Sequence, residues 1–437
     1  MQADYLIVGG GIAAARAVEG IRAQDPGGRL VLVTAESDPP YFRPLISYLL
    51  ANKVRAEAML WRGESFCAEN AVELLAGRRA VRLDAHAGTV LLDGGEEVRY
   101  GKLLLATGSR PADLPVPGRD LPGVFLFATW EDVRAIKRYL ARCPVKRAVV
   151  IGGGLVGLKA AEGLAALGIG VGLVELQDHL LPAVLDQEGG EVLAAALAEK
   201  GWKFFFGRRV TAIKGAERVC GVALDDGTVL PADLVITAAG MVPLVALAGE
   251  AGLNVQSGIV VDAYMQTSHA DIYAAGDAAQ GDEALSGQKR VLALWPIAAR
   301  QGYTAGLNMA GGRRRCLPGI AMNATTVAGL PLVTVGLSLG AEEDGFTVLK
   351  ERRPGEFFYR KLVFREDRLV GALLVGEVAR AGILTGLIRS GLPLPGRIQE
   401  LLRRDFGLLD LPAAYRESLL AQARQGLYPS GGGRDAA

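Results

Sequence analysis

The sequence predicts an α/β protein with two doubly wound domains and a small C-terminal α+β domain. Two glycine-rich turns, each between a short buried strand and a helix that leads to a second strand, predict the doubly wound units. Alternating polar and apolar segments follow each unit, and from Pro318 onward the pattern changes to five short strands and two helices. At 437 residues the chain is also too long for one ordinary core.

The first unit lies at the N-terminus. An apolar run at 5–8 predicts a buried strand, and residues 13–21 have a helical pattern. Between them Gly9, Gly11 and Ala14 give the spacing G-x-G-x-x-A. The first glycine allows a tight turn, the second lets the backbone approach a pyrophosphate, and the small third residue lets the helix pack on the strand. The N-terminus of the helix offers free N–H groups to phosphates.

A second strand is predicted at 30–34, with Glu36 just past its end. A dinucleotide-binding fold carries its ribose-binding acid at about this place. The loop at 39–48 is stiffened by prolines and carries Arg43, which is either a phosphate contact or an ordinary solvated arginine.

The next segments continue the α/β pattern. Residues 80–100 alternate in polarity around Asp93-Gly94 and predict a β-hairpin. A buried strand then ends in the small-residue turn Ala106-Thr107-Gly108. A linker rich in proline and glycine at 114–124 precedes a helix over 130–143.

The opening pattern returns in the middle of the chain. An apolar strand is followed by Gly152, Gly154 and Gly157 in the full G-x-G-x-x-G spacing, then by a helix and a second strand. Glu175 closes that strand 21 positions after Gly154, close to the expected spacing of the ribose-binding acid. Because the whole strand–helix–strand unit recurs, it predicts a second dinucleotide site.

Residues 203–230 form a second alternating region with a hairpin turn at Asp226-Gly227, and a buried strand then leads to Gly240. The segment Ala274-Ala-Gly-Asp277 delivers one carboxylate at a turn. Asp277 either accepts a hydrogen bond from a ribityl hydroxyl or caps the turn that follows. Trp295-Pro296 begins a helical run to Met309, since proline suits the first turn of a helix.

Composition bounds the class of protein. Lys and Arg number 48 against 47 Asp and Glu, so the overall charge indicates neither a nucleic-acid partner nor an anionic membrane. The most apolar stretch, 149–176, carries Lys159 and Glu162 and is not expected to span a membrane. The N-terminus lacks the basic region of a signal peptide, so we expect a cytoplasmic protein.

Cysteine and histidine usage predicts no metal site. The four cysteines are scattered without a C-x-x-C pair and the three histidines are isolated, so the cysteines are expected to be reduced thiols. Any redox chemistry must therefore come from bound cofactors.

Two dinucleotide folds in one chain, with Ala-Thr-Gly at 106–108 and Ala-Ala-Gly-Asp at 274–277, resemble the FAD-dependent pyridine nucleotide–disulfide oxidoreductase superfamily. The resemblance covers nearly the whole chain. Residues 41–47 and 359–376 are most similar to one branch. It holds NADH:rubredoxin reductases, the flavin part of NADH nitrite reductases, and flavin subunits such as that of phenylglyoxylate dehydrogenase.

The resemblance implies a division into three domains. Two Rossmann-like domains would bind FAD (1–117 and 243–316) and NAD(H) (118–242), and the C-terminal interface domain (317–437) would end in a disordered tail at 430–437. The implied cofactor contacts for FAD are Gly9, Gly11 and Ala14 at the pyrophosphate, Glu36 at the adenosine ribose, Arg43 near the phosphates, the backbone around Val81 at the adenine, Ala106, Thr107 and Gly108, Asp277 at the ribityl chain, and Ile297 in the helix whose N-terminus faces the flavin pyrimidine edge. Those for NAD(H) are Gly152, Gly154, Gly157, Glu175 and Gly240.

Two departures from the family pattern bear on mechanism. Relatives that reduce disulfides or peroxides carry a reactive cysteine in the segment aligned with 47–48, and this chain has none there. Many relatives also pair a lysine near position 48 with a glutamate at position 159, where this chain has Tyr48 and Lys159. Lys159 either stabilises an anionic reduced flavin or is simply solvated.

The function implied is an NADH:acceptor oxidoreductase that passes electrons between NAD(H) and an iron–sulfur protein through FAD, as the flavin subunit of a larger complex. The acceptor would be a rubredoxin, a ferredoxin or a complex partner. Alternatives are a freestanding NADH oxidase or a peroxide or disulfide reductase, and, from another class, an assembly protein with structural cofactors. The C-terminal domain either steers an acidic partner or forms a homodimer, and its basic residues are Arg352, Arg353, Arg360, Lys361, Arg403 and Arg404.

Overall fold

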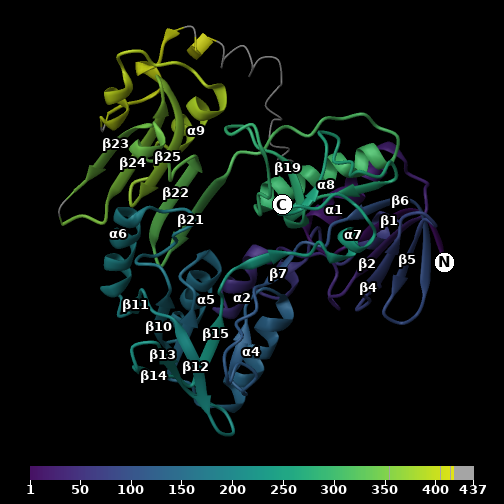
Figure 1. Cartoon of the computed structure of the whole chain (residues 1–437), viewed down its shortest axis with the longest axis horizontal. Coiled ribbons are helices and arrows are strands. Elements are labelled where there is room, and N and C mark those ends of the chain that lie inside the picture. Colours follow the sequence, from purple (N-terminus) through teal and green to yellow (C-terminus); the bar gives the residue numbers. More distant parts are fainter. Residues whose placement is uncertain (354, 404, 414, 418–437) are drawn as a thin grey trace. The chain divides into compact units, whose positions relative to one another are not determined.

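The computed structural model describes residues 1–353, 355–403, 405–413 and 415–417, so the tail expected to be disordered at 430–437 lies outside the described residues. The chain divides into two compact units (Figure 1). The larger unit comprises residues 1–183 and 194–321, and the smaller comprises 184–193 and the chain from 322 onward. Among the described residues, no helix has the length and apolar character needed to cross a membrane.

The larger unit contains the first predicted doubly wound sheet, of seven strands. In spatial order these are β3 (Val72–Ala76), β2 (Leu30–Thr34), β1 (Gln2–Val8), β6 (Glu97–Leu105), β5 (Thr89–Leu92) and β4 (Ala80–Asp84), with β18 (Ile272–Ala274) also paired to β6. The pairs β3–β2, β2–β1, β1–β6 and β6–β18 are parallel, whereas β6–β5–β4 is the antiparallel region that the hairpin pattern predicts. Because β18 joins β6, the segment around Asp277 returns to the sheet that begins with the first glycine turn.

A second sheet of the same unit is wholly parallel. In the sequence, its strands come between β6 and β18 of the first sheet. Its strands in order are β11 (Lys203–Phe206), β10 (Gly170–Glu175), β9 (Arg147–Ile151), β15 (Leu234–Thr237) and β8 (Val124–Leu126). An antiparallel sheet of β12 (Val210–Gly215), β13 (Val219–Leu224) and β14 (Val229–Pro231) contains the predicted hairpin at Asp226-Gly227. The chain enters and leaves the inserted region through β7 (Ser109–Pro111) and β16 (Met241–Pro243), which pair with each other. The short strands β17 (Ile259–Val260), β19 (Ala279–Asp282) and β20 (Lys289–Arg290) form a further small sheet.

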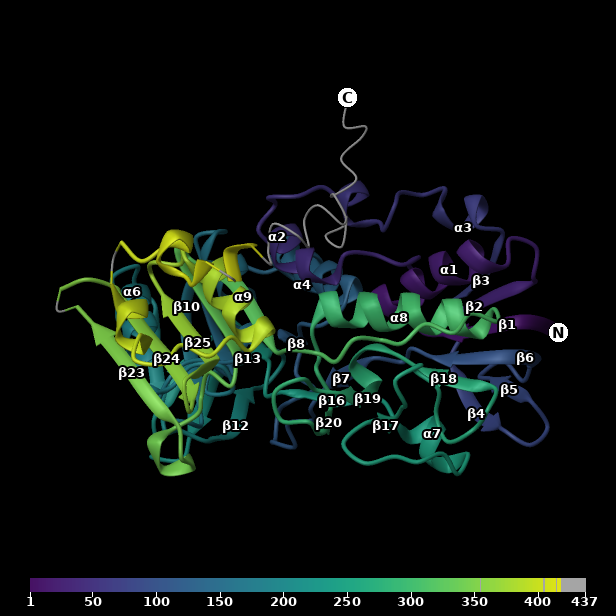
Figure 2. The ribbon, with the colours of Figure 1, turned by 90° about the horizontal axis from the view of Figure 1, so that it is seen from above.

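Helices accompany the sheets of both units. In chain order they are α1 (Ile12–Gln24), α2 (Ile46–Leu50), α3 (Phe66–Glu69), α4 (Trp130–Arg142), α5 (Leu155–Ala165), α6 (Gln187–Ala198), α7 (Ala246–Glu250), α8 (Trp295–Met309) and α9 (Ala381–Ser390). α1 and α8 lie side by side (Figures 1 and 2). A Cβ added at Gly302 would lie 2.0 Å from the carbonyl oxygen of Ala13, and one at Gly306 would lie 2.2 Å from that of Ala17. The two helix backbones are therefore in contact, which only glycine at these positions of α8 allows.

The smaller unit is built on an antiparallel sheet of five strands, as predicted. In order they are β21 (Met322–Val327), β22 (Leu330–Gly336), β25 (Arg368–Val375), β24 (Tyr359–Arg365) and β23 (Thr347–Arg352). The predicted helix at 378–389 is α9, and that at 397–402 is a 3-10 helix, Ile398–Leu402.

Segment 184–193 differs from the expected domain boundaries, because it belongs with the C-terminal strands and not with the inserted region. The Tyr359 hydroxyl donates to Asp186 Oδ2 at 2.8 Å, and Lys361 Nζ lies 3.3 Å from the same oxygen. A half-buried carboxylate that is paired with both groups holds this segment in the smaller unit.

Candidate nucleotide-binding sites

The first glycine turn is shaped by two close approaches. Gly9 has φ +130°, and a Cβ there would lie 2.0 Å from the carbonyl oxygen of Ala106, so only glycine fits. Gly11 precedes the first residue of α1, and a Cβ added there would meet no heavy atom within 4 Å. No side chain caps α1 and its first turn carries no acid. The first N–H groups of the helix therefore face open space, which fits a pyrophosphate.

The second turn repeats this geometry in the inserted region. Gly152 has φ +113°, and its added Cβ would lie 2.2 Å from the carbonyl oxygen of Ala238. Gly154 faces open space at the start of α5, which again has no side-chain cap. A Cβ at Gly157 would lie 2.0 Å from the carbonyl oxygen of Gly152, so the third glycine is required for α5 to approach its strand.

The small-residue turns that face these glycines meet where the two sheets join. The Thr107 hydroxyl donates to the carbonyl oxygen of Leu244 at 2.7 Å, and the Leu244 N–H donates to that of Gly108 at 2.9 Å. Gly240 accepts from the Ala112 N–H at 2.9 Å. Residues 106–108 and 240 therefore lie at the two ends of the paired strands β7 and β16. This pairing brings both glycine turns with their helix N-termini, here called the two cradles, into one compact unit.

Glu36 and Arg43 come together in the first domain. Tyr41 donates its hydroxyl hydrogen to Glu36 Oε2 at 2.7 Å, and Arg43 forms an ion pair with the same carboxylate. Burial would lower the pKa of Arg43, but Tyr41 and Glu36 together raise it above its usual value. Arg43 is therefore a partnered cation next to the predicted ribose acid, and not a simply solvated arginine.

Val81 lies close to that acid. It is the extra residue of a β-bulge between β4 and β5 and is 42% exposed. The turn before β4 is bonded to Glu36, because the Gly77 N–H donates to the carbonyl oxygen of Glu36 at 2.9 Å. An adenine contact through the Val81 backbone stays a prediction.

Asp277 lies on a turn between the starts of α1 and α8. Its Oδ2 accepts a hydrogen bond from the Ser109 hydroxyl at 2.8 Å and caps no helix. Gly276 has φ +80°, and its added Cβ would lie 3.2 Å from the Cβ of Ala13 and 3.7 Å from that of Ala298. The turn that carries Asp277 therefore packs against the first turns of both helices, and a ribityl contact by its carboxylate stays a prediction.

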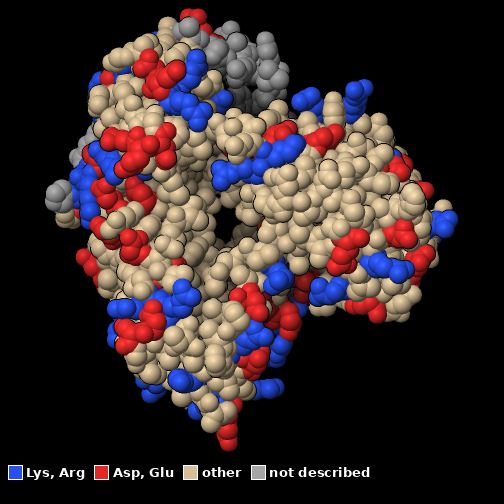
Figure 3. Space-filling model, viewed as in Figure 1, with Lys and Arg blue, Asp and Glu red and all other residues tan. Residues whose placement is uncertain are grey.

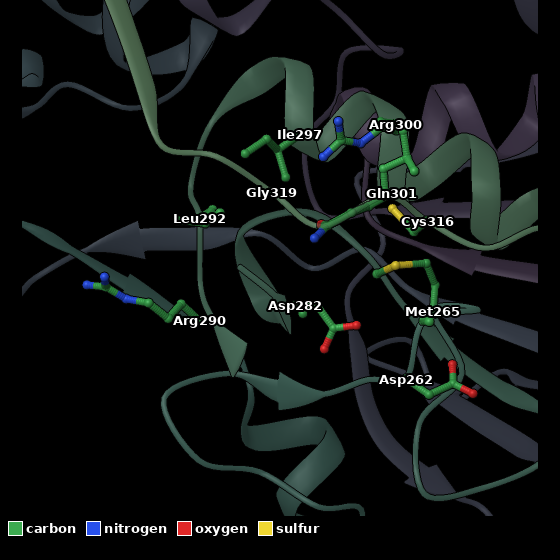
Figure 4. A pocket seen from close by; sticks show the side chains of 13 residues that line it. Asp262, Met265, Asp282, Arg290, Leu292, Ile297, Arg300, Gln301, Cys316 and Gly319 are labelled. Atoms are coloured by element: carbon green, nitrogen blue, oxygen red, sulfur yellow. The ribbon is translucent and has the colours of Figure 1, made fainter. Parts of the chain in front are cut away.

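α8 starts as the Trp-Pro signal predicts. No side chain caps it, Pro296 is in its first turn, and Ile297 is buried. Figure 4 shows Ile297, Arg300 and Gln301 on one side of a small cavity, with Cys316 beside them. The cavity measures about 10 Å³, which holds roughly one water and no cofactor. Burial raises the pKa of the Cys316 thiol, so it is a poor nucleophile at neutral pH.

Glu175 is held in a different way from Glu36. It is 8% exposed, and its two oxygens accept the N–H groups of Gly153 at 2.6 Å and Gln177 at 2.9 Å. The ends of β2 and β10 can be aligned, because each strand accepts a hydrogen bond from the first glycine of its cradle. The Gly9 N–H donates to the carbonyl oxygen of Val33, and the Gly152 N–H donates to that of Val174. Glu175 then corresponds to Thr34, and Gln177 to Glu36. The two acids therefore occupy different positions of the repeated fold.

Residues 3–302 match the family of pyridine nucleotide–disulphide oxidoreductases, and residues 322–392 match the rubredoxin NAD+ reductase C-terminal domain. The chain belongs to the pyridine nucleotide–disulphide oxidoreductase family. This confirms the resemblance inferred from the motifs, and the protein is an oxidoreductase of a family that binds FAD and a nicotinamide nucleotide.

Three similar proteins illustrate the range of this family. Over 387 residues the chain is 32% identical to the NADH-dependent phenylglyoxylate dehydrogenase subunit epsilon of Aromatoleum evansii, covering 88% of this chain and 91% of that protein. This chain is also 32% identical to the nitrite reductase [NAD(P)H] of Bacillus subtilis. The match covers 88% of this chain but only 47% of that enzyme. Putidaredoxin reductase, solved as a covalent complex with putidaredoxin, superposes with a TM-score of 0.82 at 28% identity, over 90% of this chain and 94% of that one.

The two residues that depart from the family pattern contact each other. Lys159 Nζ lies 5.2 Å from the centroid of the Tyr48 ring and 2.5 Å from Glu162 Oε2. The helices that carry them, α2 and α5, pack closely at Gly163, whose added Cβ would lie 3.2 Å from the carbonyl oxygen of Ser47. The Lys159 side chain is 18% exposed, so it is not simply solvated. A cation–π contact therefore stands where many family members have a lysine–glutamate pair.

The basic residues expected to steer a partner from the C-terminal unit differ in exposure: Arg352 and Arg403 are half-exposed, whereas Arg353, Arg360 and Lys361 are largely buried. Arg360 and Lys361 are 2% and 3% exposed, so the prediction is wrong for both. The others that the structure describes are paired with acids: Arg352 with Glu191, Arg353 with Glu351, and Arg403 with Asp405. Arg404 lies outside the described residues. When both faces of a strand are covered, the side chains on both of its sides are buried. This is why two adjacent cations of β24 are shielded from solvent.

A basic cavity of the larger unit has no counterpart in the sequence reading. Arg16, Arg300 and Arg314 line a cavity of about 410 Å³ beside Trp295 and Tyr303. Arg16 pairs with Glu19, whereas Arg300 and Arg314 form no ion pair with any described residue. The Nε1 of Trp295 and the Nε of Arg300 are buried without a hydrogen-bond partner. Figure 3 shows Lys and Arg side chains gathered over the part of this unit where α8 lies.

Proposed function

We propose that this oxidoreductase holds one FAD and passes electrons between NAD(H) and an iron–sulfur protein, as the flavin subunit of a larger complex. FAD would occupy the domain formed by 1–117 and 243–316, and NAD(H) the domain at 118–242. The observation that carries the proposal is the pair of equivalent glycine cradles joined by the β7–β16 crossing within one unit.

Named residues would hold the first nucleotide. The first-turn N–H groups after Gly11 would bind the pyrophosphate, and Glu36 would accept from the ribose hydroxyls. Asp277 would accept from the ribityl chain, and the N–H of Ile297 would stabilise negative charge at the pyrimidine edge of the flavin. When bound, FAD supplies the link between two-electron transfer with a nicotinamide and one-electron transfer with an iron–sulfur centre.

The second nucleotide would lie on the inserted domain. Gly152, Gly154 and Gly157 form its cradle, and Glu175 would accept from its ribose. Because both oxygens of Glu175 are fixed by backbone N–H groups, the carboxylate cannot swing away from a 2′-phosphate. NADH should therefore be preferred over NADPH.

Neither position 47 nor the thiols of Cys67 and Cys316 are suited to shuttle electrons between flavin and a substrate. Position 47 in α2 is a buried serine, and burial raises the pKa of the thiols of Cys67 and Cys316. A thiol-based peroxide or disulfide reductase is therefore disfavoured. Electrons would leave through a docked protein.

The basic cavity beside α8 is the docking surface that we assign to this partner. Arg300 and Arg314 line the cavity and form no ion pair with a described residue, so they favour carboxylates, which an acidic iron–sulfur protein carries on its surface. The cavity begins at Trp295, in the first turn of the helix whose N-terminus faces the expected flavin edge. The putidaredoxin complex of a relative supports a protein as the partner.

The test combines flavin bleaching with partner reduction. Without oxygen, NADH should bleach the FAD-loaded protein, which should then reduce ferredoxin or rubredoxin at a rate that falls as salt rises. Arg314→Glu should lower kcat/KM for that partner about tenfold while flavin bleaching by NADH is unchanged. Arg142→Glu, which reverses an exposed charge at the end of α4, is the matched control. If oxygen is reduced faster than every iron–sulfur protein, an NADH oxidase replaces this proposal.

A further inference from the structure

The loop that carries Glu36 and Arg43 is bonded to the start of α4, in the inserted domain. The hydroxyl of Tyr41 accepts from the Trp130 N–H at 3.0 Å while it donates to Glu36. Arg43 Nη1 donates to the carbonyl oxygen of Ala128 at 2.6 Å while Nη2 faces Glu36. The same two side chains therefore serve the predicted FAD site and a contact between domains.

A third residue pair, Arg134 with Asp38, joins the same loop to α4. Arg134 of α4 donates two hydrogen bonds to Asp38, both at 2.7 Å, and its guanidinium lies 4.5 Å from the centroid of the Trp130 ring. Fork-to-fork pairing of this kind is directional as well as stabilising. The hydrogen bonds that Arg134 donates to Asp38 are the main reason why the pKa of Arg134 is raised.

α4 transmits the position of this loop to the second cradle. Thr129 and Asp132 form a capping box at its start, so the helix end bonded to Tyr41 is rigid. The helix ends at Arg142 and the chain enters β9 at Arg147, which leads directly into the turn at Gly152. A shift of the loop therefore moves the strand that presents the nicotinamide cradle.

We propose that Tyr41 and Arg134 are positioning residues of a latch, formed by residues 36–43 and 128–134, that sets how the nicotinamide domain sits over the flavin. This inference rests on the proposed function, because it assumes one nucleotide in each cradle. The latch aligns the two nucleotides for hydride transfer and leaves the affinity for NADH to the cradle of the inserted domain.

The latch predicts a split between rate and affinity. In Arg134→Ala the Asp38 contact is lost, so the flavin reduction rate at saturating NADH should fall about 3- to 10-fold, because small misalignments of reacting groups are costly. The Kd for NADH and the FAD content should stay within about twofold of wild type. Tyr41→Phe should lower the rate in the same way and also weaken FAD binding, since Glu36 loses a donor.

Stopped-flow reduction by NADH and hydrogen exchange of segment 128–134 test this together. Exchange should rise in both variants, with or without FAD. Glu217→Ala, at an exposed position of the inserted domain outside α4 and β9, is the matched control and should change neither readout. Asp38→Ala combined with Arg134→Ala should cost no more than either alone. Arg134→Ala with wild-type rate and wild-type exchange overturns the latch.

Failure of the proposed function would look different. A wild-type protein that takes up no FAD, or is not bleached by NADH, overturns the proposed function, whereas exchange of 128–134 in the flavin-free chain still tests the latch.

Discussion

The two glycine cradles share a backbone but differ in how their acids are held. Gly9 and Gly152 approach the carbonyl oxygens of Ala106 and Ala238 in the same way. Glu36, however, is held by side chains of its own loop that also reach into the other domain, whereas Glu175 is held by backbone N–H groups of its own cradle. The acid of the first site therefore depends on a loop that is bonded to both domains, whereas the acid of the second site is bonded to the backbone of the inserted domain.

The largest expected effect comes from substituting the first glycine of each cradle, Gly9 or Gly152. Gly9→Ala should cost about 3 kcal/mol of unfolding free energy and abolish FAD retention, because its Cβ would overlap Ala106 at a strained φ. Gly152→Ala should keep FAD but lose reduction by NADH. Gly11→Ala is the control, since its Cβ meets open space, and it should fold normally while binding FAD less tightly. Flavin content and urea unfolding measure both effects. A flavin-loaded Gly9→Ala protein would contradict the shared geometry.

A second difference lies in the strands that open the two sheets. Tyr5 of β1 donates to Asp25 at 2.8 Å, whereas the equivalent residue of β9 is Ala148. Burial and Asp25 raise the pKa of Tyr5 to about 12. A raised folded-state pKa stabilises the fold below the unfolded value near 10, and this stability is lost as pH rises toward 12.

The expected loss at alkaline pH is about 2 kcal/mol. Tyr5→Phe should not show this loss, because it lacks the hydroxyl. The difference in unfolding free energy between wild type and variant should therefore shrink from pH 9 to pH 11.5. Urea unfolding at both pH values gives this difference. An unchanged difference would show that the Tyr5–Asp25 bond is not linked to the proton.

The acid of the second cradle should govern nucleotide choice. Glu175→Ala should reduce the ratio of kcat/KM for NADH to that for NADPH about tenfold, since the charge that repels a 2′-phosphate is removed. Steady-state kinetics with both nucleotides measure this ratio. A wild-type preference for NADPH, or an unchanged ratio in the variant, would contradict the role of Glu175. Glu36→Gln, in the first cradle, should leave the ratio unaltered.

The smallest expected effect concerns the cysteines. A variant with Cys67, Cys143, Cys220 and Cys316 all changed to serine should be bleached by NADH at nearly the wild-type rate, because electrons pass directly between the nucleotides of the two cradles. Flavin loading and circular dichroism check that the variant is folded. Loss of bleaching in a folded, loaded variant would mean that a thiol takes part.

The sequence by itself determined the two cradles, the hairpins, the five C-terminal strands and the family. These features are local: a glycine spacing encodes positive φ values and helix starts, and a period of two encodes strands. Only the tertiary structure decided which distant residues meet, namely Gly302 with Ala13, Tyr48 with Lys159, and Arg16 with Arg300 and Arg314. It also showed that Arg360 and Lys361 are buried. A charged residue type does not reveal whether its strand is covered on both faces, because burial depends on what packs against the element and not on the element itself.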